Sequence, residues 1–227
     1  FSKSVVIDCG MDYTKVGISD SEVTSKCVRT VVGRDTHGAK FFSDEALSDR
    51  GHLSLKYPIE REFITDFDGI KDFWLNIYRK ELKIEPQQQP IHFGLRSTEK
   101  KGYKEKICEI FLEEFRTSGF FISYNSLLSL YATGKTLGIV VDCGAGSTSV
   151  VSAQEGLTND HCDFSESLGG VDVDRFIMNE IKKSPSAAHS KIDLEVARQV
   201  KLANCKLETE SLLKKKEPVS GALEAKW

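Results

Sequence analysis

Short apolar runs bounded by polar turns predict strands at several points along the chain. Near the start, residues 4–8 and 15–19 are typical of a hairpin, and residues 28–33 predict a third strand. Residues 91–93 predict a buried strand and residues 120–123 a short one. The spacing of these runs leaves room for helices between them.

Apolar residues spaced three and four apart predict those helices. Asp66 is a good N-cap for a helix that places Ile70, Phe73, Trp74 and Ile77 on one face. We interpret Trp74 as a core residue, since aromatic side chains at helical spacing usually pack inside. Two further helices are predicted at about residues 103–115 and 125–133, the second ended by Gly134. A third follows Gly170 and aligns Val173, Phe176, Ile177 and Ile181. A fourth begins at about Asp193 and places Val196, Val200, Ala203 and Leu207 on one face.

A later stretch, Ile139–Gln154, repeats the first hairpin, Ile7–Ser19. When Asp142 is matched to Asp8, an Asp-Cys-Gly sequence recurs and the threonine and valine that follow it coincide as well. Each copy is an apolar run, a turn with a glycine and a second β-rich run, which predicts a second hairpin. Turn amides form concave anion sites, and a nearby aspartate can hold a hydrated Mg²⁺. The repeat therefore predicts a phosphate bound between two duplicated lobes.

Composition and charge narrow the class of protein. With 40% hydrophobic and 29% charged residues among 227, the chain has an ordinary globular composition. A net charge of −3 argues against direct binding of nucleic acid. No apolar run approaches the ~20 residues of a membrane span, so no membrane partner is expected. The scattered cysteines favour reduced thiols, and the isolated histidines give no metal site.

Several longer segments carry a family resemblance, and they follow one another in a single order. The segments are VVGRD (Val31–Asp35), DEALSDRG (Asp44–Gly51), LKYPIE (Leu55–Glu60), SLYATGKTLGIVVDCGAGST (Ser129–Thr148) and LGGVD (Leu168–Asp172). Through them the chain resembles actin and the actin-related proteins from about Val5 to about Leu207.

The resemblance implies an α/β, actin-like ATPase fold with two ribonuclease-H-like lobes and duplicated β-hairpin phosphate loops. It implies a first lobe at residues 1–132, with a shortened insert of the small-subdomain type at about 34–57, and the start of the second lobe at 133–227. The loop that inserts into a neighbouring actin subunit is reduced to Thr36–Ser43, either as a true deletion or as an omission. The later part of the family has no counterpart here. We therefore expect a fold that is incomplete at the C-terminus, with exposed core faces on both lobes.

In the first turn, the resemblance assigns nucleotide contacts that this chain keeps only in part. Asp8, Gly10 and Lys15 match the family, whereas Met11 and Asp12 replace a small hydroxyl residue and a glycine. A carboxylate facing a phosphate in a cleft of low dielectric costs up to about a few kcal/mol. The alternative is that Asp12 points outward to solvent.

The second turn keeps more of the family pattern. The resemblance assigns its phosphate cradle to Gly144, Ala145, Gly146, Ser147 and Thr148, with Ala145 in place of the usual acidic residue. It assigns Mg²⁺, held through water, to Asp8 and Asp142. On the adenine side Arg198 and Lys201 are retained, while Leu202 replaces their acidic partner.

The candidate catalytic residues are Asn125 and Asp142. Asn125 takes the place of the glutamine that orients the attacking water in actin, and Ser149 replaces a histidine near the same water. A side chain one methylene shorter positions water less well, so hydrolysis should be weak. Arg61 occupies the position of a histidine next to the hinge.

These departures favour a degenerate nucleotide site with weak or absent ATPase activity. ATP or ADP with Mg²⁺ would then be a structural ligand, and whether any nucleotide is bound stays open. The first hypothesis is a divergent actin or actin-related protein that is a structural subunit of a larger cytoskeletal or motor-associated assembly. Its partners would be other protein subunits, and its location the cytoplasm and cytoskeleton, the cilium included.

Three alternatives are weighed against this hypothesis, and only the third belongs to another functional class. The first is a polymer-forming, ATP-hydrolysing actin of a divergent lineage, and the second is an actin-related subunit of a chromatin-remodelling complex in the nucleus. The third, a sugar-kinase-like or chaperone-like ATPase of the same two-lobed fold, is disfavoured because LKYPIE and SLYATGKT belong to the actin branch.

Overall fold

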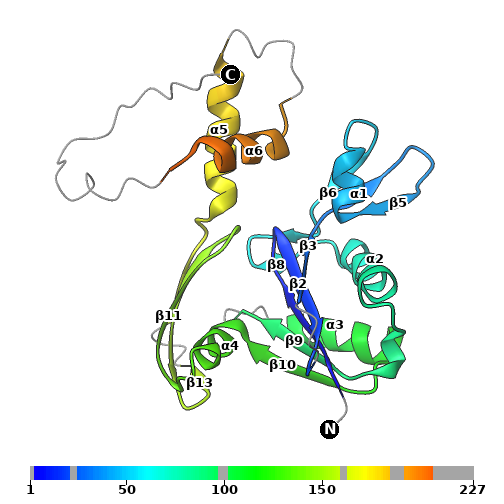
Figure 1. The fold of residues 1–227 in the computed structure, drawn as a ribbon, viewed down its shortest axis with the longest axis vertical. Coiled ribbons are helices and arrows are strands. Elements are labelled where there is room, and N and C mark those ends of the chain that lie inside the picture. The colour runs from blue at the N-terminus through cyan, green and yellow to red at the C-terminus, as the bar shows by residue number, and fades with distance from the viewer. Residues whose placement is uncertain (1–2, 21–24, 97–101, 159–162, 185–191, 207–227) are drawn as a thin grey trace, which may run out of the picture. The chain divides into compact units, whose positions relative to one another are not determined.

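The structure is a computed structural model that describes residues 3–20, 25–96, 102–158, 163–184 and 192–206 (Figure 1). It divides into two compact units, Phe1–Gly169 and Gly170–Trp227. The predicted lobe boundary between residues 132 and 133 falls inside the first unit and stays a prediction. Leu207 and residues 214–227 lie outside the described residues. Across the described part of the chain, none of the helices is long and apolar enough to cross a bilayer.

A mixed sheet of five strands organises the first unit (Figure 1). Its strands, in spatial order, are β10 (Phe120–Tyr124), β9 (Ile91–Leu95), β1 (Val5–Cys9), β2 (Tyr13–Ile18) and β3 (Lys26–Arg29). β1 pairs with β9 in parallel, and β9 pairs with β10 in parallel, while the remaining pairs are antiparallel. The first predicted hairpin and the two later strands are confirmed.

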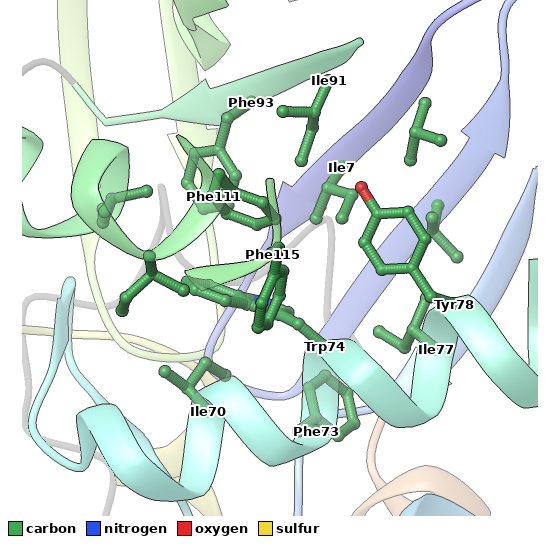
Figure 2. Packing of buried hydrophobic residues seen from close by; sticks show 14 of the residues in the cluster. Ile7, Ile70, Phe73, Trp74, Ile77, Tyr78, Ile91, Phe93, Phe111 and Phe115 are labelled. Carbon is green, nitrogen blue, oxygen red and sulfur yellow. The ribbon is translucent and has the colours of Figure 1, made fainter. Parts of the chain in front are cut away.

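The main core lies between this sheet and two helical segments. These are α2 (Phe67–Asn76), which continues into the π-helical segment η1 (Ile77–Leu82), and α3 (Tyr103–Glu109), which continues into the π-helical segment η3 (Ile110–Glu114). Figure 2 shows Trp74 among Phe93 and Phe111, and the rings of Trp74 and Phe111 lie 4.8 Å apart. Trp74 is fully buried, which confirms its interpretation as a core residue.

The first residue of α2 is fixed by a side-chain cap. The carboxylate of Asp66 accepts a hydrogen bond of 3.0 Å from the amide of Gly69, as predicted for an N-cap. Before α2 lies the small hairpin of β7 (Ile59–Glu60) and β8 (Phe63–Ile64), and after it the 3₁₀ turn η2 (Pro86–Gln88). The turn of this hairpin contains Arg61.

The predicted strand 28–33 is wrong as a single element. It divides into β3 and β4 (Val32–Arg34), which belong to different sheets. The strand divides because Val31 packs in a separate cluster with Ala46, Leu47 and Leu53. β4 lies between β5 (Lys40–Phe42) and β6 (Ser54–Lys56), and the short helix α1 (Ser43–Ser48) completes this small insert.

A second sheet within the first unit contains the repeated hairpin. It consists of β11 (Leu137–Cys143), β12 (Thr148–Gln154), β13 (Leu157–Thr158) and β14 (Phe164–Glu166), and α4 (Asn125–Ala132) packs against it. α4 ends as predicted, with Gly134 just beyond it at a φ of +74°. Leu137, Ile139 and Val141 of β11 are exposed.

The second unit contains α5 (Gly170–Lys183) and α6 (Leu194–Asn204). The predicted apolar faces of both helices are wrong in part. Ile177 and Ile181 are buried against Ala197, as part of one cluster, but Val173 and Phe176 are exposed. Ala197, rather than the exposed Ala203, is the buried alanine of α6. The helices meet along a narrower stripe than the apolar pattern predicts, and part of it is polar: Asp174 is buried there.

Candidate functional site

The two hairpins have the same register, which confirms the duplication predicted from the sequence. Cys9 pairs with Thr14 at the end of β1, and Cys143 pairs with Thr148 at the end of β11. The turns close alike: the amide of Gly10 donates to the carbonyl of Tyr13 at 3.1 Å, and that of Gly144 donates to Ser147 at 2.9 Å. Met11 and Asp12 form the tip of the first turn, and Ala145 and Gly146 that of the second.

Met11 and Asp12, which replace the family's residues in the first turn, both make contacts within the first unit. Met11 packs against the main core, although it also lines a small cavity. The carboxylate of Asp12 pairs with the guanidinium of Arg29 at 3.3 Å, and Arg29 is itself nearly buried on β3. The side chain of Asp12 is 26% exposed, and whether it faces a phosphate or solvent stays a prediction. Its charge is compensated by the neighbouring strand.

Asp8, at the end of β1, has both carboxylate oxygens engaged. The ammonium of Lys15 lies 2.9 Å from Oδ2, and the side-chain amide of Asn125 donates to Oδ1 at 2.9 Å. The hydrogen bond to Asp8, followed by the charge of the same carboxylate, raises the pKa of Lys15. Lys15 and Asn125 thus hold Asp8 from two sides.

Asn125 also lines a cavity beside the first turn. The cavity has a volume of about 20 Å³, and Gly10, Met11, Arg61 and Arg96 are among its other lining residues. A volume of this size accommodates about one water molecule. The Oδ1 atom of Asn125 is buried and accepts no hydrogen bond from the described residues. A water next to Asn125 would therefore have an acceptor there, and the role of Asn125 in positioning water stays a prediction.

Arg96, which is not among the predicted site residues, contacts the second turn. Its Nη1 donates to the hydroxyl of Ser147 at 2.8 Å, and its Nη2 lies 3.4 Å from Oδ2 of Asp142. On the other side Nη1 lies 3.5 Å from a carboxylate oxygen of Glu62, which also accepts a hydrogen bond of 2.7 Å from Ser165. One guanidinium therefore joins the second turn to the β7–β8 hairpin.

The position of Arg96 in the chain contained a signal for this role. Asp8 pairs with Gly94 where β1 and β9 run in parallel, and Arg96 follows directly after β9. Ligands of α/β sheets gather at the carboxyl ends of parallel strands. A basic residue at the end of the strand beside Asp8 was therefore a candidate on topology alone.

Arg61 reaches the same turn from the β7–β8 hairpin. Its Nη1 donates to the carbonyl of Gly146 at 3.1 Å, and its backbone has a φ of +58°. An ideal Cβ on Gly146 would lie 2.4 Å from the carbonyl oxygen of Arg61, so only glycine fits this close approach. Among the remaining cradle residues, Ser147 is buried and Thr148 donates to the carbonyl of Leu168 at 2.8 Å.

Arg198 and Lys201 lie on α6, in the second unit. Lys201 pairs with the buried carboxylate of Asp174 at 2.6 Å and donates to the carbonyl of Gly170 at 3.0 Å. The site described above therefore consists of residues of the first unit, and the adenine-side assignment of these two residues stays a prediction.

The residues of the two turns do not fit a hydrated Mg²⁺. Within the described residues, Asp8 is paired with Lys15, and Asp142 with Arg96. Mg²⁺ binds through carboxylates and keeps several of its waters, so it needs uncompensated acceptors and room beside them. The described residues also contain no cluster of three or more His, Cys, Asp or Glu side chains that could hold a metal. The basic side chains and the glycine-containing turn suit an anion better.

Comparison with protein families gives one result for this chain. A family model described as Actin matches residues 2–220. The match includes both hairpin turns, Arg96 and the two helices of the second unit.

Proposed function

Because this chain belongs to the actin family, we propose that it is a divergent member that serves as a structural subunit of a larger cytoskeletal or motor-associated assembly. Its nucleotide cleft is degenerate, with weak or absent ATPase activity. Proteins of this family generally bind a nucleotide with a divalent metal, so ATP or ADP is the ligand class that a residual site would accept.

The main support is the state of the two aspartates at the strand ends. Metal-dependent hydrolysis requires carboxylates that hold the metal, directly or through water, beside the terminal phosphate. Here Arg96 pairs with Asp142, while Lys15, which matches the family, pairs with Asp8. The first turn adds Met11 and Asp12, which contact the core and Arg29. These contacts favour a protein that binds a ligand or serves as a scaffold over one that hydrolyses ATP.

The partners proposed are other protein subunits, without direct contact to nucleic acid or membrane. The proposed location is the cytoplasm and cytoskeleton, the cilium included, and the nucleus is the alternative. A protein of this kind needs no nucleotide cycle, because its role is to present surfaces to its neighbours.

One observation favours the alternative of a polymer-forming ATPase. Asn125 contacts Asp8 and lines a cavity with room for about one water, as a residue that orients an attacking water would. The two functions differ in turnover and in self-assembly, so one pair of assays separates them.

The test measures phosphate release and sedimentation of the purified protein with Mg-ATP. We expect release close to that of a buffer blank and no pelleted polymer. Turnover comparable to that of a polymerising actin, together with polymer in the pellet, would overturn the proposal and establish the alternative.

A further inference from the structure

The Arg96 guanidinium lies beside Asp142, the carboxylate to which the family resemblance assigns the hydrated metal. It is 3.4 Å from Oδ2 of Asp142, and its Nη2 lies 2.6 Å from the place of an ideal Cβ on Gly144. The side chain of Arg96 thus lies against the second turn and on one side of the Asp142 carboxylate, which is 49% exposed. A metal held by Asp142 through water would require the same space.

Arg96 is held in this position by residues outside the turns. Glu62 pairs with it at 3.5 Å, and the side chain of Glu62 is only 9% exposed. Ser165 donates to the same carboxylate oxygen of Glu62 at 2.7 Å. Because a buried carboxylate is costly to leave unpaired, Glu62 keeps the guanidinium in place. The positive charge beside Asp142 therefore belongs to a side chain that Glu62 holds in place.

The other strand-end aspartate is compensated independently. Lys15 lies 2.9 Å from Asp8, and the charge of Asp142 also contributes to raising the pKa of Lys15. Two basic side chains consequently face the two carboxylates that would hold a metal. A divalent ion entering here would meet the like charges of Lys15 and Arg96 at short range.

From this geometry we propose that Arg96 takes the place of a divalent metal beside Asp142, and that the cleft excludes Mg²⁺. A phosphate-bearing ligand that binds here does so without a metal, with Arg96 and Lys15 as its counter-ions. The inference rests on the proposed degenerate cleft and specifies its ligand as a metal-free phosphate anion.

The experiment measures binding of Mn²⁺ alone, as a probe of the metal site, by isothermal titration calorimetry. The first variant is Arg96→Met combined with Glu62→Gln, which removes both members of the Glu62–Arg96 pair and leaves Asp142, about half exposed, without its guanidinium partner. Adding Asp142→Asn to this variant removes the carboxylate that would take up the metal. Arg79→Met is the control for loss of an arginine, because Arg79 is exposed on η1. Circular dichroism verifies that each variant is folded.

We expect no saturable Mn²⁺ site in the wild type or in the Arg79→Met control. Arg96→Met with Glu62→Gln should gain one saturable site, at least about tenfold tighter than any residual Mn²⁺ binding of the wild type, since a cation at short range from the carboxylate is removed. Asp142→Asn should abolish the gained site. Conversion of Arg96 to Lys, which preserves the charge, should leave the metal excluded.

Two results would overturn the inference. One is a wild-type Mn²⁺ site that Mg²⁺ displaces and that Asp142→Asn alone removes. The other is a folded Arg96→Met, Glu62→Gln variant that gains no site. Either result leaves the structural-subunit proposal standing, because that proposal fails only on turnover and polymer formation in the assays with Mg-ATP.

Discussion

Gly146 is the residue where the two hairpin turns tolerate least change. A Cβ placed on it would lie 2.4 Å from the carbonyl oxygen of Arg61, and backbone atoms cannot rotate away as a side chain can. We expect Gly146→Ala to lower the free energy of unfolding by about 1–3 kcal/mol, measured by urea denaturation. Gly51→Ala is the matched control, since nothing lies near a Cβ at that position. Equal losses in both variants would contradict the close approach.

The Glu62–Arg96 pair gives a second prediction at the residue scale. Arg96→Met leaves the carboxylate of Glu62, 9% exposed, without its guanidinium. Such a loss typically costs about 3–5 kcal/mol, and we expect a value in this range from denaturant unfolding. Glu62→Gln added to Arg96→Met should recover part of that loss, because the buried carboxylate that has lost its guanidinium is removed. A double variant as unstable as the sum of the two single variants would contradict a direct coupling.

At the scale of elements, α2 depends on its cap. Asp66 accepts a hydrogen bond from the amide of Gly69 at 3.0 Å and pairs with Lys56 at 2.8 Å. We expect Asp66→Ala to lower the free energy of unfolding by about 0.5–2 kcal/mol at neutral pH. Asp68→Ala is the control, because Asp68 is an exposed residue in the same first turn.

The cap should also depend on pH. Burial opposes ionisation of Asp66, but the hydrogen bonds from Lys56 and Gly69 outweigh it and lower the pKa of the carboxyl group. A group with a lowered folded pKa contributes stability that is fully present above its ordinary pKa of about 3.9 and is lost as the pH falls through the folded value. The difference between wild type and Asp66→Ala should therefore shrink in acid. A difference that is constant down to pH ~2 would contradict this linkage.

Local patterns predicted most elements because their causes are local. The cap of α2, the glycine that ends α4 and the two hairpins each depend on residues within a few positions of one another. The predictions that failed depend on tertiary packing between residues distant in the chain. Residues 28–33 read as one strand, but Val31 packs with the insert and divides them. Val173 and Phe176 have helical spacing, yet α5 is buried along Ile177 and Ile181.

The same distinction applies to the candidate site. Asp8, Lys15 and Asp142 follow from the repeated hairpin, which is visible in the sequence. The arginines were missed or assigned elsewhere because their partners are distant in the chain: Arg96 contacts Asp142, and Arg61 contacts Gly146. Neither contact follows from residue spacing, and only the place of Arg96 directly after β9 indicated its role. The charge balance of the site is therefore a property of the fold, not of any motif.

At the scale of the molecule, stability should be independent of divalent metal. The carboxylates of both turns already have basic partners, so a chelator has no structural cation to remove. We expect the melting temperature in EDTA to equal that in millimolar Mg²⁺ within about one degree, measured by differential scanning calorimetry. A drop of several degrees in EDTA that Mg²⁺ restores would contradict this account.

The central claim is that the cleft does not turn over nucleotide. The most direct measurement is the small-molecule content of the freshly purified protein, released by denaturation and separated by ion-exchange chromatography. We expect either an empty protein or ATP that persists for hours, because the groups that would hold the metal and contact the terminal phosphate are paired within the protein. Stoichiometric ADP would contradict the account, since it would require a working metal site and a water positioned by Asn125.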